Sequence, residues 1–138
     1  MIFYLDTSVV LRILFGEANP VSVWKKWKKA YSSALWQIEA LRTIDRMRLT
    51  HEITDMEVAA LVREVQIIHE TLAICPMDDR ILQRAGETFP TVVGTVDAIH
   101  LASALSIREI DNLDAVLTHD LQLATAARSL GFNVIGTE

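Results

Sequence analysis

Short, unbroken apolar runs alternate with longer segments of helical periodicity along this chain, and this alternation restricts the fold more than any other feature. Runs that are apolar at every position suit strands buried on both faces of a sheet. Strands of this kind that alternate with helices form a parallel sheet covered by helices on both sides. Strands are expected at 2–5, near 31–33, and at 72–75, 114–118 and 132–135. The pattern therefore predicts a three-layer α/β/α sandwich around a short parallel sheet, with residues 1–138 forming one domain.

Capping residues mark where the helices between these strands begin and end. Thr7 or Ser8 is expected to cap the first helix, which Gly16 closes. Thr54 and Glu57 have the spacing of a capping box. The other helices are expected at 21–30, 34–48, 58–70, 79–89, 97–109 and 120–130. This order of elements is typical of open α/β sheets.

Composition and charge limit the classes of function open to the chain. Apolar residues make up 51% of the 138 positions and charged residues 22%, which is typical of a globular protein. The net charge of −5 argues against a broad basic surface, so a nucleic-acid partner would need a local basic patch or bound cations. No apolar run approaches the roughly 20 residues that span a membrane, and the first residues lack the features of a signal peptide. With one cysteine, Cys75, expected as a small buried hydrophobe, the sequence predicts a soluble cytoplasmic protein.

Four acidic residues fall where ligands gather in open α/β sheets, beyond the carboxyl ends of the strands. Asp6 directly follows the first strand, and Asp120 comes just after the fourth. Asp97 opens a helix after a loop, and Glu39 lies on a helix that can turn its edge toward the same place. We expect these four carboxylates to share one site.

Each of these acids also has a purely structural explanation. Aspartate is a favoured helix cap, so Asp97 and Asp120 taken singly are better explained as caps. Glu39 taken singly is better explained as a solvated helix residue. Asp6 is different, because a carboxylate against a buried strand must be capped or coordinated. Only the four acids together favour a functional site.

An oxygen-rich site of this kind suits Mg²⁺ or Mn²⁺. These ions prefer oxygen ligands, keep several waters and need only a few carboxylates from the protein. Such an ion activates a water molecule and neutralises charge on a phosphate during in-line displacement. A negatively charged protein that acts on a negatively charged polymer needs cations between the two, which fits the net charge. The acids therefore predict a metal-dependent hydrolase whose general base is a metal-bound water or hydroxide and not a side chain.

Four stretches of the chain together resemble the motif blocks of PIN-domain proteins, and most closely the toxin ribonucleases of bacterial VapBC toxin–antitoxin systems. The stretches are YLDTSVVLRIL (4–14), SALWQIEALRTIDR (33–46), GTVDAIHLASAL (94–105) and VLTHDLQLATAARSLGFNVI (116–135). Each block is weak alone, and together they extend over nearly the whole chain. The resemblance implies a PIN-like α/β fold and a Mg²⁺- or Mn²⁺-dependent endoribonuclease, the toxin of a toxin–antitoxin pair.

The same resemblance implies roles for individual residues and for partners. The family's acidic, metal-binding quartet corresponds to Asp6, Glu39, Asp97 and Asp120. Thr118 matches the hydroxyl that precedes the fourth acid, and Asp45 lies close enough to Glu39 to compete for the second acidic position. RNA is the implied substrate and a VapB-like antitoxin the implied partner. The implied assembly is a homodimer or a toxin–antitoxin hetero-oligomer.

The most basic stretch of the chain is WKKWKK at 24–29. On the helix predicted at 21–30, Trp24 and Trp27 share one face with lysines around them. Aromatic residues beside lysines can stack on and grip RNA, but a tryptophan stripe at helical spacing is more often core or protein interface. In the resembling toxins the early helices help form a groove for the antitoxin. Trp24 and Trp27 are therefore candidates for the partner interface.

Two alternative functions stay open at this point. A phosphatase of the haloacid dehalogenase type also begins with a strand that ends in Asp, but it requires a second acid where this chain has Ser8. A catalytically idle PIN fold that serves as a binding module is the other alternative, which a metal-dependent cleavage assay would test. Two histidines near the acids are interpreted as structural, His100 as a hydrogen-bonded core residue and His119 as a turn residue.

Overall fold

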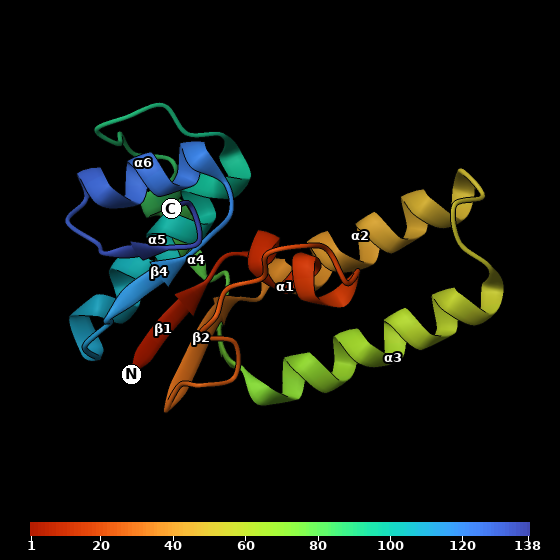
Figure 1. Ribbon diagram of the computed structural model, residues 1–138. Coiled ribbons are helices and arrows are strands. Elements are labelled where there is room, and N and C mark those ends of the chain that lie inside the picture. The colour runs from red at the N-terminus through yellow and green to blue at the C-terminus, as the bar shows by residue number, and fades with distance from the viewer.

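The computed structural model describes residues 1–138 and is built on a five-stranded parallel sheet (Figure 1). The strands are β1 (Ile2–Leu5), β2 (Lys29–Ser33), β3 (Ala73–Cys75), β4 (Ala115–Leu117) and β5 (Val134–Ile135). Their order across the sheet is β3-β2-β1-β4-β5, and every neighbouring pair runs parallel. The chain builds outward from β1 to β3 and then returns to the other side of β1 for β4 and β5. This reversal places the switch point of the sheet between β1 and β4.

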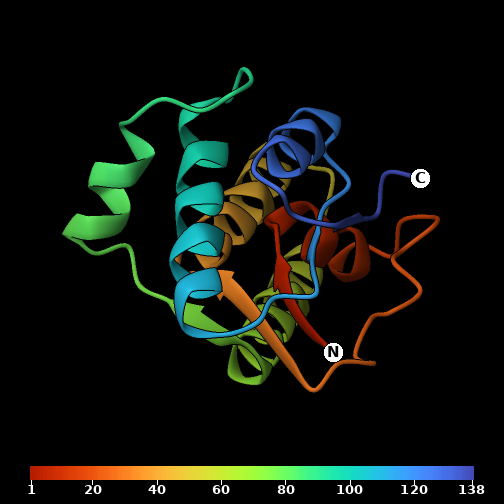
Figure 2. The ribbon, with the colours of Figure 1, turned by 90° about the vertical axis from the view of Figure 1, so that its left-hand side faces the viewer.

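Helices cover both faces of the sheet. They are α1 (Thr7–Leu14), α2 (Leu35–Leu49), α3 (Asp55–Thr71), α4 (Asp79–Ala85), α5 (Thr95–Ile110) and α6 (Leu121–Ser129). α1, α2 and α3 pack on one face, while α5 and α6 pack on the other and α4 lies outside α5 (Figure 2). α2 and α3 form a long hairpin that extends beyond the sheet (Figure 1). The predicted three-layer α/β/α sandwich is therefore confirmed.

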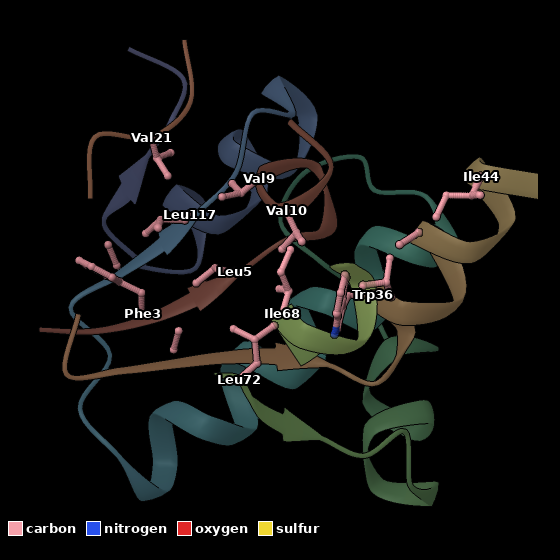
Figure 3. Close-up of a cluster of buried hydrophobic side chains, with 14 residues drawn as sticks. Phe3, Leu5, Val9, Val10, Val21, Trp36, Ile44, Ile68, Leu72 and Leu117 are labelled. Atoms are coloured by element: carbon pink, nitrogen blue, oxygen red, sulfur yellow. The ribbon is translucent and has the colours of Figure 1, made fainter. Parts of the chain in front are cut away.

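Alternating side chains of β1 divide the core into two clusters, one on each face of the sheet. Phe3 and Leu5 belong to the cluster under α1, α2 and α3, where Trp36 is also fully buried (Figure 3). Tyr4 lies on the opposite face and packs with residues of α5 and α6. Successive residues of a strand face opposite sides, so a strand that is apolar at every position contributes to both layers. Each fully buried large apolar side chain stabilises the fold by about 1.5 to 3 kcal/mol.

The start of α1 differs from the sequence prediction, because neither predicted hydroxyl caps the helix. Asp6 occupies the N-cap position, and its side chain makes no capping hydrogen bond. The hydroxyl of Thr7 donates to Glu39 and that of Ser8 donates to Asp6, so acidic side chains engage both groups. Gly16 follows the end of the helix as predicted, with a φ of +63° that glycine adopts without strain.

Residues 21–30 do not form the predicted helix. The segment makes turns before β2, and Lys25 has a left-handed φ of 60° that no regular helix contains. The ring of Trp27 packs edge-on against Phe3 with 6.4 Å between centroids, and Trp24 packs edge-on against Trp27 at 5.2 Å. Both tryptophans are half-buried against the core and do not form a stripe on a helix face. Packing of the rings on β1 thus overrides local helix propensity.

Other helix boundaries also differ from their predicted positions. α4 ends at Ala85 and not at residue 89, with Gly86 at the C-cap position, because glycine is a poor helix former. α5 begins at Thr95, earlier than predicted, so Asp97 lies within its first turn. None of the helices combines the length and the apolar character needed to cross a membrane.

Candidate active site

The carboxyl ends of β1 and β4 lie side by side at the switch point, and two of the predicted site residues are located there. The backbone N–H of Asp6 donates to the carbonyl of Leu117 at 2.9 Å, which joins the ends of the two strands. Asp6 follows β1 and Thr118 follows β4, and the Thr118 hydroxyl donates to Asp6 Oδ2 at 2.8 Å. Ligands of open α/β sheets bind at such a crevice.

Asp6 is a buried carboxylate with 5% of its surface exposed, and neighbouring donors fix its orientation. Ser8 Oγ donates to Oδ2 at 2.6 Å, in addition to the bond from Thr118. His100 Nε2 lies 3.4 Å from the other oxygen, Oδ1. A buried carboxylate without such partners would be strongly destabilising. The hydroxyls satisfy Oδ2 and leave Oδ1 with only the histidine near it.

Thr118 links Asp6 to Asp120. Its hydroxyl accepts a hydrogen bond from the backbone N–H of Asp120 at 3.0 Å while it donates to Asp6. Asp120 is the N-cap residue of α6, and its Oδ1 accepts from the N–H of Leu123 at 2.9 Å. The cap explanation is therefore right for Asp120. The residue is nevertheless exposed, and its Oδ2 makes no hydrogen bond, so capping leaves one oxygen for another ligand.

Asp97 is not a helix cap, because the N-cap position of α5 precedes Thr95 and no side chain caps the helix. Burial raises the pKa of the half-buried Asp97 carboxyl to about 6, and the charges of Asp120 and Asp6 add to the rise. Glu39 raises this pKa further. The charges of three other acids thus act on Asp97, so the fold places these three acids within electrostatic range of Asp97.

Glu39 turns inward from α2 and joins this cluster. Its Oε1 accepts hydrogen bonds from Thr7 Oγ1 at 2.6 Å and from His100 Nε2 at 2.8 Å. Asp45, the other acid in the same block, instead accepts a hydrogen bond from Arg48 at 2.8 Å. That hydrogen bond lowers the pKa of the Asp45 carboxyl. The structure therefore brings Glu39, and not Asp45, to the site.

His100 is the buried, hydrogen-bonded histidine that the sequence predicted, with 1% of its surface exposed. Tyr4 Oη lies 2.8 Å from Nδ1, and Glu39 accepts from Nε2. Because the Glu39 carboxylate only accepts, Nε2 carries a proton, and in the neutral ring Nδ1 accepts from the Tyr4 hydroxyl. Burial lowers the pKa of His100, but the hydrogen bond to Glu39 and the charge of Asp6 outweigh burial and raise it. Both ring nitrogens are engaged in hydrogen bonds.

Three residues of the hydrogen-bond network around the acids were not predicted from the sequence: Tyr4, Thr7 and Ser8. Thr7 and Ser8 directly follow Asp6 at the end of a strand, which indicated that their hydroxyls could contact the acids. Their predicted role was instead helix capping. Ser8 also accepts from the backbone N–H of His119 at 3.0 Å, so it ties the start of α1 to the end of β4. Tyr4 and His100 lie 96 positions apart, and no local pattern in the sequence connects them.

The donor set fits a divalent cation, although it does not form a ready-made cage. No three of the Asp, Glu, His and Cys side chains are arranged to hold a metal ion by themselves. Mg²⁺ usually binds one or two carboxylates and keeps several waters, so a three-ligand cage is not required. Burial is the largest cause of the raised pKa of Asp97, and the charges of Asp120, Asp6 and Glu39 add to it, so negative charges lie near one another at this edge of the sheet. Carboxylate oxygens around such a concentration of charge are the donors that Mg²⁺ and Mn²⁺ prefer.

The profile of the PIN domain family matches residues 3–129 of the chain. The chain belongs to the PIN domain family. This PIN domain is 26% identical over 129 residues to "Ribonuclease VapC47" of Mycobacterium tuberculosis (strain CDC 1551 / Oshkosh), with 94% of the chain and 92% of the relative covered. It is 28% identical over 135 residues to "Ribonuclease VapC46" of Mycobacterium tuberculosis (strain ATCC 25618 / H37Rv), with 96% and 95% covered. The haloacid dehalogenase alternative is therefore wrong.

Solved structures share the fold of this PIN domain over almost its full length. VapBC2 from Rickettsia felis, bound to a DNA fragment from its promoter, superposes with a TM-score of 0.67 at 12% identity and covers 97% of both chains. A toxin–antitoxin complex from Klebsiella pneumoniae gives 0.64 at 15% identity, with 96% and 94% covered. VapBC-1 from nontypeable Haemophilus influenzae gives 0.63 at 14% identity, with 97% and 96% covered. At these identities the likeness establishes the fold alone.

Proposed function

We propose that the chain is a divalent-metal-dependent endoribonuclease that hydrolyses RNA phosphodiester bonds, and that it is the toxin of a toxin–antitoxin pair. The convergence of four carboxylates at the switch point of a PIN domain carries this proposal. The names of two relatives support it, because both are ribonucleases. The complexes in which similar folds occur support an antitoxin partner.

Four acids share the work of the proposed site. Asp6 and Asp97 would hold the ion, and Glu39 and Asp120 complete the set of carboxylates. When bound, Mg²⁺ or Mn²⁺ supplies Lewis-acid chemistry, since it neutralises phosphate charge and lowers the pKa of a bound water. Thr118 sets the spacing of two acids, because its hydroxyl donates to Asp6 and accepts from the backbone of Asp120.

We propose that a metal-bound water or hydroxide, and not a side chain, acts as the general base. His100 is the only imidazole hydrogen-bonded to the acids, and its two nitrogens are engaged by Tyr4 and Glu39. We therefore assign His100 and Thr7 to orienting Glu39, which accepts a hydrogen bond from each. The protein contributes orientation and charge to the proposed site.

An apolar hollow between α1, α2 and α3 supports an antitoxin as partner. It has a volume of about 410 Å³, and its apolar lining consists of Leu14, Phe15, Met47, Ile53, Ala60 and Leu61. An amphipathic helix places its apolar face in a groove of this kind. Trp24 and Trp27 do not line this hollow and stay separate candidates for the partner interface. A homodimer or a toxin–antitoxin hetero-oligomer is the assembly that we propose.

Cleavage of cellular RNA by the purified protein tests the proposed activity. We expect cleavage in Mn²⁺ or Mg²⁺, none in chelator, and loss of cleavage in Asp6→Asn. Asp45→Asn is the matched control, because it removes an acid of the same helix block that lies outside the cluster. Antitoxin binding without cleavage in either metal would favour the idle PIN fold instead.

A further inference from the structure

Every lysine of the chain lies in one stretch of five residues. Lys25, Lys26, Lys28 and Lys29 form this group, which we call the lysine surface. Nine arginines remain among the 13 basic residues, against 18 acidic ones, so the rest of the chain carries a charge of −9. Positive charge is thus concentrated at one place on an otherwise acidic protein.

Three of these lysines are free for a ligand. Lys25, Lys26 and Lys28 are exposed, and none of them forms an ion pair, whereas Lys29 lies 3.8 Å from Asp111. Arginines of the chain are more often engaged, as in the pairing of Arg48 with an aspartate. The unpaired ammonium groups keep their full charge available to an anion.

The tryptophans fix the shape of this surface. Trp24 and Trp27 pack edge-on against each other, and Trp27 packs on Phe3 of β1. The turn between them contains Lys25 in its left-handed conformation. Burial of the rings against the core therefore anchors a turn whose lysine side chains remain outside.

The lysine surface lies at the opposite end of β2 from the acidic site. β2 begins at Lys29 and ends at Ser33, so its ends are separated by about 13 Å at about 3.3 Å per residue. A hollow of about 450 Å³ is lined by Arg12, by Ser22 of the segment that precedes the lysines, and by His119, next to Asp120. Figure 2 shows the segment between α1 and β2 running from beside the C-terminus toward the N-terminus. Glu138 is the one acidic side chain of the hollow.

We propose that the lysine surface binds backbone phosphates of a single-stranded RNA substrate whose cleaved bond lies at the acidic site, and that the hollow connects the two. This inference rests on the proposed ribonuclease function. Four carboxylates repel an RNA strand, so binding energy for the strand has to come from cations outside the site. Lysines supply such contacts as point charges on flexible stems, without reading bases. RNA is favoured over an acidic protein because the segment that precedes the lysines lines a hollow that also contains His119, the residue next to Asp120.

The salt dependence of RNA binding tests this proposal. Binding of a fluorescein-labelled, single-stranded RNA oligonucleotide of mixed sequence is measured by anisotropy in chelator, where the proposed cleavage does not occur. The logarithm of the affinity falls with the logarithm of salt by about 0.7 per phosphate contact, so replacing Lys25, Lys26 and Lys28 by Gln should reduce this slope by about 2. The ratio of the wild-type RNA affinity to the RNA affinity of the variant should therefore fall by roughly twentyfold between 50 and 200 mM salt.

A second triple variant, Arg42→Gln with Arg46→Gln and Arg63→Gln, changes the net charge equally on α2 and α3. Its slope should stay close to that of the wild type. Equal losses in the two variants, no loss in the lysine variant, or a loss that affects antitoxin binding but not RNA binding would overturn the proposal. Absence of metal-dependent cleavage by the wild type would instead count against the ribonuclease function, because the binding assay does not depend on it.

Discussion

Replacing Asp97 by asparagine should stabilise the metal-free protein, although the change removes a proposed metal ligand. Asp97 is half-buried near three other acids, and its pKa of about 6 reflects the free-energy cost of its ionised form. Asparagine keeps the shape of the side chain and removes the charge. The expected increase in the free energy of unfolding is the cost of ionising Asp97 minus the favourable interaction of its charge with the first turn of α5.

The magnitude follows from the pKa rise, from 3.8 to about 6. At about 1.36 kcal/mol per pKa unit, the rise corresponds to about 3 kcal/mol. Solvent screens a half-exposed carboxylate, which reduces the value to about 1.5 kcal/mol. An acid in the first turn of a helix is favourable by roughly 0.5 kcal/mol, which asparagine loses. We therefore expect the variant to be more stable by about 1 kcal/mol and to melt about 3 to 5 °C higher.

The direction of the pH dependence is fixed by the raised pKa of Asp97. Below pH 3.8 its carboxyl is protonated in both the folded and the unfolded chain, so the variant and the wild type should have equal stability. As pH rises from 3.8 to about 6, the unfolded chain releases the proton that the folded protein retains. The stability of the wild type therefore falls relative to that of the variant, and the full difference is present above this window.

Thermal melts of both proteins in chelator, across this pH range, measure the difference. Asp45→Asn is the control, because the hydrogen bond from Arg48 lowers the pKa of Asp45 and neutralising it should destabilise slightly as pH rises. At ten times its dissociation constant, Mg²⁺ should stabilise the wild type by about 1.4 kcal/mol and the Asp97→Asn protein by less. If Asp97→Asn were less stable than the wild type in chelator at every pH, the repulsion among the acids would be refuted.

Two further substitutions test the support around the acids. His100→Leu should weaken Mn²⁺ affinity about tenfold because Glu39 loses a hydrogen-bond donor, and His100→Gln should recover part of the loss through its amide; calorimetric titrations that gave equal affinities would contradict this. Gly136→Ala should destabilise by about 2 kcal/mol or more in urea unfolding, because a Cβ there would overlap the carbonyl of Thr118 at a φ of +120°. Gly86→Ala, where a Cβ makes only ordinary contacts, should leave stability nearly unchanged, and similar losses in both glycine variants would count against the steric explanation.

The sheet and most helices could be predicted because their determinants are local. Short apolar runs identify β1, β3 and β4, and the capping box of Thr54 and Glu57 forms as predicted at the start of α3. The helix prediction for residues 21–30 is wrong because long-range packing decides the structure of this segment. Trp27 packs on Phe3 of β1, and neither helix propensity nor periodicity contains that contact.

The acids divide in the same way. Asp6 and Asp120 could be placed at one edge because each follows a strand, and parallel strands end together. The position of Glu39 in the sequence gave no such indication, since a helix residue can face solvent or the site. Glu39 was preferred to Asp45 as the second acid because of the resemblance to PIN-domain proteins. The hydrogen bond from Thr7 that turns Glu39 inward joins residues 32 positions apart, beyond the range of any sequence pattern.

The chain order of these contacts has a consequence during synthesis of the protein. The hydrogen bond between Asp6 and Thr118 joins residues separated by 112 positions. While the chain emerges from a ribosome, Asp6 cannot accept this hydrogen bond until β4 has been translated and inserted beside β1, because domains generally fold as units. On the proposed function, an unfinished chain would leave the messenger and the ribosome that make it intact, and the ability to cut RNA would arise only once nearly the whole polypeptide had been made.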